Sequence, residues 1–514
     1  MCHRDGTANL FAPVQVAGPV IRAAVVIHRW LGVALCPLFL LWFLSGIAMM
    51  YADFPAVTDR DRLMRAAGLE TSSVLLTPRD AFAVLHSTGS LSAVRLNTVD
   101  TRPVYRFDVG GDERIVYADT GSPLTNVSPG VMGQIAARWT GQPLRTATVT
   151  AIRDVDQWTV QAPLRTLRPL WKYSWPDGEQ VYVAQASGDV VQYTTTGSRI
   201  AAYLGPVPHW LYFTPIRTHQ RFWTALVTWT SGLGTIGALL GLAIGVWRYS
   251  PAKRYSRAGA PTRIPYSGPK WWHMAFGLSA GVAAVTWAFS GMLSMDPFST
   301  PAPPAQRGSA DDRPRARVAA ALSGPVDMNA FSALPPANAL SRLAGFDVKE
   351  LELVSFAGEP AYLATVAGGG TRVVPLAGQP ALAFDRARLL DAIEHAARDR
   401  DELETRLLDG YDAYYFDRRQ LRPLPVIVAE FRDPDRTRLY IDPKTARIVG
   451  SYSTAEWMSR WAYHGLHSLA FPGLYDRRPL WDVVVLTMLI GGIVLSMTAL
   501  MLAWRVARVR GTRP

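Results

Sequence analysis

The sequence predicts an α-helical membrane protein with four transmembrane helices, arranged as two pseudo-symmetric helix–lobe–helix repeats that carry two exported α+β lobes. Three observations lead to this prediction. Four stretches are long and apolar enough to cross a bilayer, one pattern of residues occurs twice, and basic residues concentrate in short segments beside the apolar stretches. With 514 residues and 49% apolar content, the chain can also bury several cores.

The four apolar stretches each meet the requirement of roughly 20 mostly apolar residues for a membrane-spanning helix. They cover Ala23 to Met50, Phe222 to Trp247, Trp271 to Met295 and Val483 to Trp504. Polar segments of domain size separate the first from the second and the third from the fourth. The predicted organisation is 1–22 (N-terminus), 23–50 (first span), 51–208 (first lobe), 209–248 (interfacial segment and second span), 249–270 (basic loop), 271–296 (third span), 297–465 (second lobe), 466–505 (interfacial segment and fourth span) and 506–514 (tail).

The repeated pattern lies in the first and third spans. His28, Gly32, Trp42, Ser45 and Gly46 recur at the same spacing as His273, Gly277, Trp287, Ser290 and Gly291. A histidine near the start of both spans suggests two ligands directed at one metal or cofactor. Helix packing by small residues is the alternative reading for the glycines, and the favoured one for the two serines.

The basic residues indicate the orientation of the spans rather than a nucleic-acid partner. The formal charge is +12, and the middle loop and tail contribute Arg248, Lys253, Arg254, Arg257, Arg263, Lys270, Arg505, Arg508, Arg510 and Arg513. Short loops rich in Lys and Arg stay in the cytoplasm. Both termini and the middle loop are therefore expected there, and the lobes on the opposite side, which in a bacterial inner membrane is the periplasm.

The two cysteines exclude a disulfide framework in the exported lobes. They are Cys2 and Cys36, and Cys36 is expected to be a small packing residue beside a helix-kinking Pro37. A cleaved signal peptide is the rival interpretation of residues 1–50. It is disfavoured because the apolar stretch is longer than a signal core and repeats an internal span.

The duplication continues into the lobes. Three residues recur 257 positions later: Pro103, Tyr105 and Pro123 match Pro360, Tyr362 and Pro380. Further along, the run Arg168, Pro169 and Leu170 matches Arg422, Pro423 and Leu424, and Tyr182 matches Tyr440. Four more residues recur 258 positions later: His209, Leu211, Phe213 and Trp223 match His467, Leu469, Phe471 and Trp481. Within each lobe, strands, short helices and Gly or Asp turns indicate small α+β modules, two per lobe.

Four of the nine histidines occupy repeat-equivalent positions: His28 with His273, and His209 with His467. The first pair begins its helices on the cytoplasmic side, about 26 Å from Ser45 and Ser290 at about 1.5 Å per residue. The second pair precedes the outgoing helices on the outer side, so the two pairs cannot share one metal. We expect each pair to meet across a pseudo-twofold axis.

Pairs of imidazoles inside a helical bundle are the expected axial ligands of haem. Zinc or copper sites more often add carboxylate or sulfur ligands, of which the spans offer few. Gly32 and Gly277 would let a planar macrocycle approach the backbone. A histidine satisfied by a neighbouring hydroxyl or carbonyl is the alternative for any single position. His464, three residues before His467, ranks second as outer ligand or as a substrate contact, and His219 is read as an interfacial surface residue.

The chain resembles the PepSY-associated transmembrane family of bacterial inner-membrane proteins over nearly its whole length. The resemblance is carried by HRWLGVALCPLFLLWFLSGIAMM from His28, YDAYYFDRRQLRPLPVIVAEFRDPDRTRLYIDPKTARIVGSY from Tyr411 and RWAYHGLHSLAFPGLYDRRPLW from Arg460. It implies PepSY-like lobes on a four-helix core. For the characterised branch it also implies a dihaem (haem b) reductase of ferric siderophores in the periplasm.

By position, the resemblance assigns His28 and His273 to an inner haem and His209 and His467 to an outer one. The electron donor would be a quinol or a cytoplasmic reductase, and the acceptor a ferric siderophore or another ferric chelate. Such one-electron reduction needs no nucleophile or acid–base pair, and the sequence offers no motif for either. An aromatic and basic cluster is a possible contact for an anionic chelate, although packing is the favoured reading for most of its members: Tyr411, Tyr414, Tyr415, Arg418 and Arg419.

Two further hypotheses remain. In the first, the lobes form a membrane-anchored PepSY binding or regulatory module without redox activity, and the histidines are structural. In the second, the protein is a permease for iron or the intact chelate. The permease is disfavoured because four helices are few and lack the broken half-helices of transporters.

Overall fold

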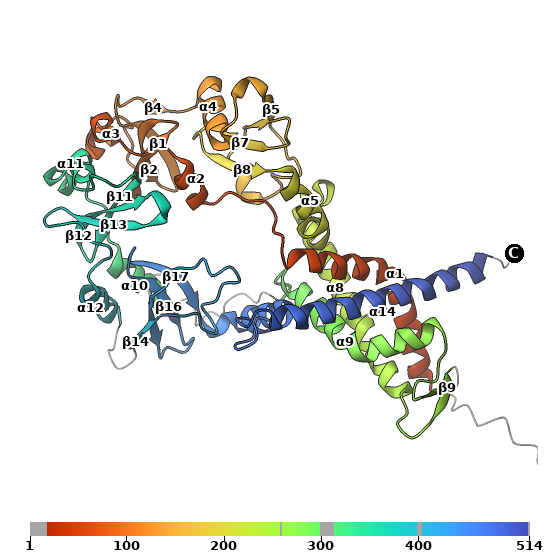
Figure 1. The fold of residues 1–514 in the computed structure, drawn as a ribbon. Helices are drawn as coiled ribbons and strands as arrows, with labels where there is room; N and C mark the ends of the chain where they lie inside the picture. The colour runs from red at the N-terminus through yellow and green to blue at the C-terminus, as the bar shows by residue number, and fades with distance from the viewer. Residues whose placement is uncertain (1–17, 258–259, 299–312, 398–402, 512–514) are drawn as a thin grey trace, which may run out of the picture.

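A computed structural model describes residues 18–257, 260–298, 313–397 and 403–511; Cys2, His3 and Arg513 lie outside these ranges. The chain is a mixed α and β protein in which four long helices extend from a β-rich part (Figure 1). The long helices are α1 (Pro19–Met49), α8 (Gln220–Arg248), α9 (Pro269–Leu293) and α14 (Leu480–Gly511). They agree with the four predicted spans to within a few residues, except that α14 runs further at its C-terminal end.

All four helices are long and apolar enough to cross a membrane. Only 17–33% of the most apolar window of each helix is buried inside the protein. The exposed side chains include Trp229, Val282 and Met501, which is the surface composition that a lipid environment favours over water. The fold therefore fits a membrane protein.

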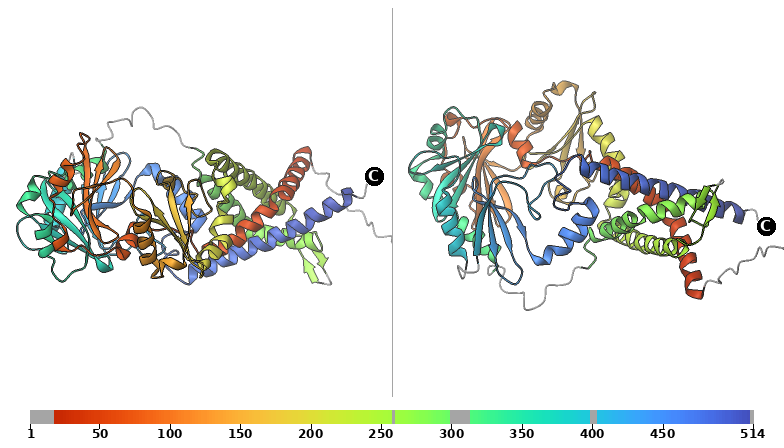
Figure 2. Two further views of the ribbon diagram at one scale, coloured as in Figure 1. Left: turned by 90° about the horizontal axis from the view of Figure 1, so that it is seen from above. Right: turned by 60° about the horizontal axis from the view of Figure 1, so that its bottom comes forward.

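The four helices pack as a closed set. Helix α8 lies against α9 and α1, and α14 lies against α1 and α9. Figure 2 shows this bundle beside the β-rich part from two further directions. The start of α1 and the small hairpin of β9 (Tyr255–Arg257) and β10 (Ala260–Thr262) lie at the end of the bundle away from the sheets (Figure 1).

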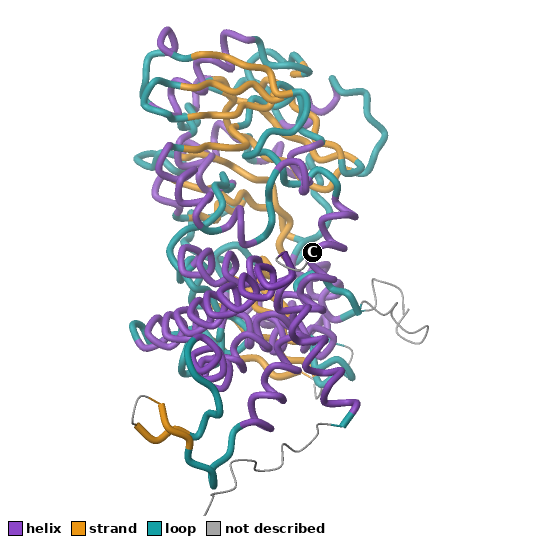
Figure 3. The backbone as a smooth tube through the Cα atoms, turned by 90° about the vertical axis from the view of Figure 1, so that its right-hand side faces the viewer, coloured by secondary structure: helices purple, strands orange, loops and turns teal. Residues whose placement is uncertain are grey.

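The β-rich part contains three larger sheets. Figure 3 looks from the side of the long helices and shows the strands above and behind them. The largest has the order β13-β12-β11-β1-β2-β3-β4, and the other two are β5-β6-β7-β8 and β14-β15-β16-β17. The strands are β1 (Leu91–Val99), β2 (Arg102–Val109), β3 (Asp112–Tyr117), β4 (Pro123–Leu124), β5 (Thr148–Ile152), β6 (Leu170–Ser174), β7 (Gln180–Ala184), β8 (Val190–Thr194), β11 (Val348–Phe356), β12 (Glu359–Val366), β13 (Thr371–Pro375), β14 (Leu403–Leu408), β15 (Val426–Phe431), β16 (Arg438–Asp442) and β17 (Arg447–Tyr452).

The seven-stranded sheet separates three hydrophobic cores. One face packs on α3 (Pro78–Ala83) and α11 (Pro336–Ser341), around Tyr105 and Tyr362. The other face is covered at one end by α4 (Pro129–Thr140) and the β5–β8 sheet, and at the other end by α10 (Pro314–Leu322), α12 (Arg386–Ala396) and the β14–β17 sheet. The middle of this second face, over β1 and β11, therefore lies between two flanking modules.

The structure departs from the prediction of two separate lobes in one respect. Strand β1, from residues 51–208, pairs antiparallel with β11, from residues 297–465, with Val94 opposite Leu353 and Leu96 opposite Leu351. The two predicted lobes thus share one sheet. Sequence periodicity identifies strands but contains no information on a partner about 250 residues away, which explains the difference.

Short helices connect the β-rich part to the bundle. After β8 follow α5 (Thr196–Leu204), α6 (Pro206–His209) and α7 (Thr214–Arg217). After β17 follow a π-helical segment, Met458–Gly465, and α13 (Leu466–Ser468). Helix α2 (Asp59–Arg65) follows α1. Gly205 permits α6 to approach α1, because a Cβ there would lie 3.2 Å from the backbone nitrogen of Met49.

Candidate cofactor site

The structure brings the four repeat-equivalent histidines together in two pairs. The ring centroids of His28 and His273 are 6.2 Å apart, and those of His209 and His467 are 6.0 Å apart. His28 and His273 lie in α1 and α9, whereas His209 is the last residue of α6 and His467 lies within α13, at the β-rich side. The two pairs are therefore an inner and an outer site within one bundle.

The outer histidines are held by matching backbone arrangements. Leu211 and Leu469, each two residues after its histidine, have φ of 53° and 47°, a left-handed conformation that leucine rarely adopts. The indole of Trp223 in α8 donates to the carbonyl of Trp210 at 2.7 Å, and the indole of Trp481 in α14 donates to Ser468 at 2.9 Å. Each histidine-bearing turn is thus fixed to the long helix that follows it.

Two serines orient the outer imidazoles. His209 Nδ1 lies 3.1 Å from Ser45 Oγ, and His467 Nδ1 lies 3.0 Å from Ser290 Oγ. Each serine hydroxyl donates its own proton to a backbone carbonyl one turn earlier, Ser45 to Leu41 at 2.6 Å and Ser290 to Thr286 at 2.6 Å. Each hydroxyl oxygen is therefore left to accept from Nδ1.

The inner imidazoles have equivalent partners. His28 Nδ1 lies 2.9 Å from the carbonyl of Gly237, which can only accept. His273 Nδ1 lies 3.2 Å from Thr498 Oγ1, whose hydroxyl donates to the carbonyl of Leu495 at 2.8 Å. A Cβ on Gly241 would collide with the imidazole of His28, so glycine is required there.

In all four histidines, then, Nδ1 carries the proton and Nε2 keeps a free lone pair. A hydrogen-bonded Nδ1 with a free Nε2 is the arrangement that orients metal-ligating histidines. Two imidazoles on opposite sides of one metal ion place their ring centres about 6 Å apart, from two metal–nitrogen bonds of about 2 Å and about 1 Å from each nitrogen to its ring centre. The measured 6.2 and 6.0 Å fit this geometry.

A cavity of about 410 Å³ surrounds the outer pair, a size within the roughly 300–1,000 Å³ range of cofactor sites. Its lining is largely aromatic and apolar, and its charged members are Asp53 and Arg418. Burial, the largest cause, lowers the pKa of His209 to about 4 and the pKa of His467 to about 3. Both imidazoles are neutral at neutral pH, which is the form that ligates metal.

Small residues leave room beside the histidines. A Cβ on Gly46 would lie 3.1 Å from a methyl of Leu489 and 3.8 Å from His209 Cε1, and one on Gly291 would lie 3.8 Å from His467 Cε1. At Gly32 a Cβ would meet nothing within 4 Å, and at Gly277 it would meet only a Leu495 methyl at 3.8 Å. The two glycines one turn from the inner histidines thus border open space, as a flat macrocycle requires.

Aromatic rings occupy the bundle between the two pairs, which are about 26 Å apart along α1. Phe39 and Phe43 have centroids 6.0 Å apart, and Phe43 lies 5.9 Å from Trp287. Trp42 lies 5.8 Å from Phe39. These rings come from α1 and α9, the helices that also carry the inner histidines.

His464 does not face His209. Its ring lies 4.8 Å from Tyr463 and 5.9 Å from Phe416, and it is His467 that meets His209. Burial is the largest cause of the lowered pKa of His464, followed by the charges of Arg460 and Arg422. His219 Nδ1 contacts the carbonyl of Pro215 at 3.1 Å at an exposed position.

The aromatic and basic cluster is mainly packed. Tyr415 is fully buried and stacks on Tyr440 at 4.7 Å, Tyr414 lies 4.0 Å from Tyr452, and the hydroxyl of Tyr411 donates to the carbonyl of Arg422 at 2.9 Å. Arg418 and Arg419 both pair with Asp53 at the end of α1. Arg418 alone of this cluster lines the outer cavity.

Several residues of the site were not expected from the sequence. The sequence favours a packing role for Ser45 and Ser290, although their recurrence in both spans is a usable signal. Trp223 and Trp481 also recur. No such signal indicates the roles of Gly237, Gly241 and Thr498.

Among the described residues, no group of three or more His, Cys, Asp or Glu side chains gathers as a metal site. Neither a protein-family model nor a curated protein matches this chain.

Proposed function

We propose that this protein is an inner-membrane dihaem oxidoreductase of the PepSY-associated transmembrane type, which passes electrons across the membrane to reduce a ferric siderophore or another ferric chelate in the periplasm. The observation that carries the proposal is the pair of bis-histidine sites. In each site the ring centroids are about 6 Å apart, Nδ1 is hydrogen-bonded and Nε2 is free.

Haem b fits these sites better than a bare metal ion. Haem b would be held by His28 and His273 at the inner site and by His209 and His467 at the outer site, and its macrocycle would supply the other ligands of the iron. The open space at Gly32, the aromatic lining of the outer cavity and its 410 Å³ volume support a flat apolar group. When bound, haem supplies reversible one-electron chemistry.

The residues of the chain orient the ligands and control access. The four imidazoles are held in one tautomer by the hydroxyls of Ser45, Ser290 and Thr498 and the carbonyl of Gly237. Trp223 and Trp481 fix the outer turns, so that the ligand nitrogens are placed before a cofactor arrives. Preorganisation of this kind reduces the rearrangement that accompanies electron transfer.

We further propose that the two halves are related by a pseudo-twofold axis and that the β-rich part is exported. The basic loop after α8 and the end of α14 lie at the inner-pair end of the bundle, which the positive-inside rule assigns to the cytoplasm. One electron from a quinol or a cytoplasmic reductase then enters on the inner side, and one Fe(III) chelate is reduced to Fe(II) on the outer side.

An optical spectrum of the detergent-purified protein, expressed with added haem precursor, tests the proposal. We expect sharp b-type bands after dithionite reduction and about two haems per chain. The control is His219→Ala, which changes an exposed histidine outside both pairs and should leave both haems in place. Colourless protein would contradict the proposal and favour the binding-module hypothesis, in which the histidines are structural.

A further inference from the structure

A polar cleft lies on the face of the seven-stranded sheet between the two flanking modules. Its volume is about 520 Å³, and it is lined by residues of β1, β2, β11, α2 and α4 and of the turns β7–β8 and β16–β17. Side chains alternate between the faces of a strand. Because Val94 and Leu96 of β1 point into the core on the opposite face, Arg95 and Asn97 point into the cleft.

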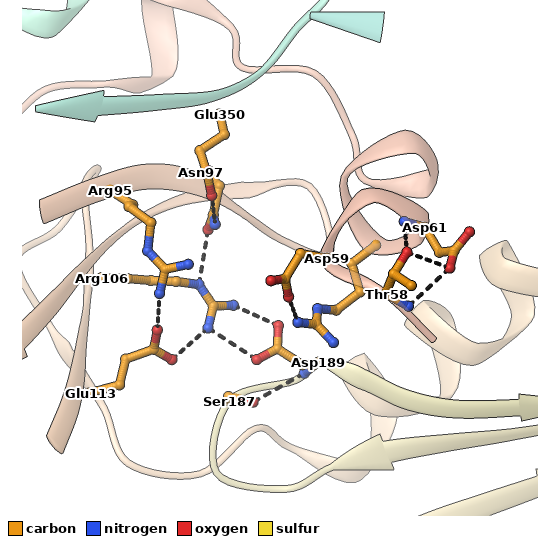
Figure 4. A network of polar contacts seen from close by, with 11 residues as sticks. Thr58, Asp59, Asp61, Arg95, Asn97, Arg106, Glu113, Ser187, Asp189 and Glu350 are labelled. Carbon is orange, nitrogen blue, oxygen red and sulfur yellow. Dashed lines mark hydrogen bonds and ion pairs between the residues drawn. The ribbon is translucent and has the colours of Figure 1, made fainter. Parts of the chain in front are cut away.

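Arg106 lies at the centre of a network in this cleft (Figure 4). Its side chain is 5% exposed and donates to Asp189 at 2.9 and 3.1 Å, to Glu113 at 2.8 Å and to Asn97 at 3.0 Å. The residue 257 positions later is Leu363, which is also buried. The fold therefore accepts an apolar residue at this position. Because burying a guanidinium costs free energy, Arg106 is explained by a role other than stabilising the fold.

Most charges in the cleft are paired with each other. The ion pairs are Arg62 with Asp59, Arg95 with Glu113, Arg106 with Glu113 and Asp189, Arg138 with Asp100, and Arg447 with Glu352. Within the described part of the chain, two lining carboxylates have no ion pair, Asp108 and Glu350. Asp108 Oδ1 is buried without a hydrogen-bond partner, and Glu350 accepts one hydrogen bond, from the Asn97 amide at 2.9 Å.

The cleft differs in charge from the rest of the chain. Its lining contains six arginines and seven acidic residues, a formal charge of −1, in a protein whose total is +12. Burial is the largest cause of a raised pKa at Glu350, so its charge is under-compensated. Thr371, whose Oγ1 is buried without a partner, also lines the cleft, and its hydroxyl oxygen can accept from an ammonium group. Arg65 also lines the cleft and has no ion pair among the described residues; its guanidinium lies 4.4 Å from the centre of the Trp139 ring. The two carboxylates without an ion pair, Asp108 and Glu350, thus outnumber this arginine by one.

We propose that this cleft binds a small linear organic cation with ammonium groups at both ends, and that Asp108 and Glu350 are its two anionic contacts. Asp108 lies on β2 and Glu350 on β11, on either side of β1. They are two strand spacings apart across the sheet and four residues apart along it, because Asp108 lies opposite Ala93 and Glu350 lies at the level of Asn97, so their backbones are about 16 Å apart. One ammonium group reaches only one of these carboxylates, whereas a linear cation whose terminal nitrogens are about 10 Å apart reaches both through hydrogen bonds of about 2.8 Å. The proposal does not depend on the redox function.

Isothermal titration calorimetry of the full-length protein in detergent, with spermidine as the probe and propylamine as the monoamine control, tests the proposal. We expect spermidine to bind and propylamine to bind at least about 10-fold more weakly, because a single ammonium group can pair with only one of the two carboxylates. Glu350→Gln and Asp108→Asn should each weaken spermidine binding by about 10-fold or more. Asp112→Asn, at an exposed turn of the same hairpin, should leave it unchanged.

Four outcomes would overturn the proposal: no heat of binding at low-millimolar spermidine, equal affinity for propylamine, equal affinity in all three variants, or displacement of spermidine by Ca²⁺. Melting temperatures of the variants show whether a loss of binding reflects misfolding. If one variant unfolds, the other still tests the site. The haem spectrum is recorded in the same samples, so that a failure of this site is distinguishable from a failure of the redox sites.

Discussion

Ser290 Oγ lies 3.0 Å from His467 Nδ1, and its own proton is donated to the carbonyl of Thr286. The hydroxyl can therefore only accept from the imidazole. The same relationship joins Ser45 to His209, so the two halves of the chain use one device twice. A serine one helical turn from its carbonyl partner thus decides which nitrogen of a distant histidine is free to ligate.

We predict that Ser290→Ala weakens the outer site without removing its ligand. Loss of the acceptor leaves Nδ1–H of His467 unpaired and allows the ring to rotate, and outer-shell changes of this kind cost about 10-fold or more in metal affinity or activity. The measurement is the haem content and the reduction potential of the outer site. Ser290→Thr retains the hydroxyl and should restore both.

Ser279→Ala is the matched control, because Ser279 lies in the same helix and bonds the carbonyl of Ala275 at an exposed position. A Ser290→Ala protein with unchanged haem content and potential would mean that the hydroxyl has no role in ligation.

The sequence predicts the pairing of the histidines because the duplication relates them. Recurrence at a constant offset identifies His209 and His467 as equivalents, and equivalents near an axis meet. It does not distinguish His467 from His464, which lie three residues apart. In the structure His464 belongs to the π-helical segment and His467 to α13, a change of helix type that the sequence pattern does not indicate.

The pairing of strands across the two predicted lobes could not be predicted from the sequence, for a different reason. Strands β1 and β11 belong to different predicted lobes, and the pairing of Arg95 with Glu352 depends on tertiary packing alone. The cleft follows from that pairing, because it lies over the two joined strands. A site formed between halves of the chain leaves no contiguous motif.

The two proposed haems should be separable by mutation. His28→Ala or His273→Ala removes one axial ligand of the inner pair, which has no structural contact with the outer cavity in the described lining. We expect about one haem per chain to remain, with the spectrum of the outer site intact. His395→Ala, at an exposed position, serves as a control. Retention of both haems in each inner variant would disprove the pairing.

Arg418 should contribute to the outer cofactor site, whereas Arg419 should not. Both pair with Asp53, but Arg418 is the arginine that lines the cavity, where it also donates to the Met49 carbonyl at 3.0 Å. Haem carries carboxylate groups that an arginine can pair. We expect Arg418→Gln to lower haem retention of the outer site and shift its potential, and Arg419→Gln to change neither. Equal effects would indicate that only the link to Asp53 matters.

The stability of the cleft should depend on pH through Glu350. Burial, the largest cause, raises the folded-state pKa of this carboxyl, with Glu352 adding to the rise and the Asn97 amide, Arg95 and Arg106 opposing it. An acid with a raised folded pKa binds its proton more tightly when folded, so its contribution to stability falls as pH increases from the unfolded pKa to the folded one. Glu350→Gln removes this dependence. We expect the melting temperature of the variant, relative to that of the parent protein, to increase between pH 4 and pH 7. Unfolding is measured by intrinsic fluorescence in detergent.

Glu70→Gln, which changes an exposed side chain, is the control and should show no such trend. If the melting temperatures of Glu350→Gln and of the parent protein change with pH in parallel, the prediction is refuted.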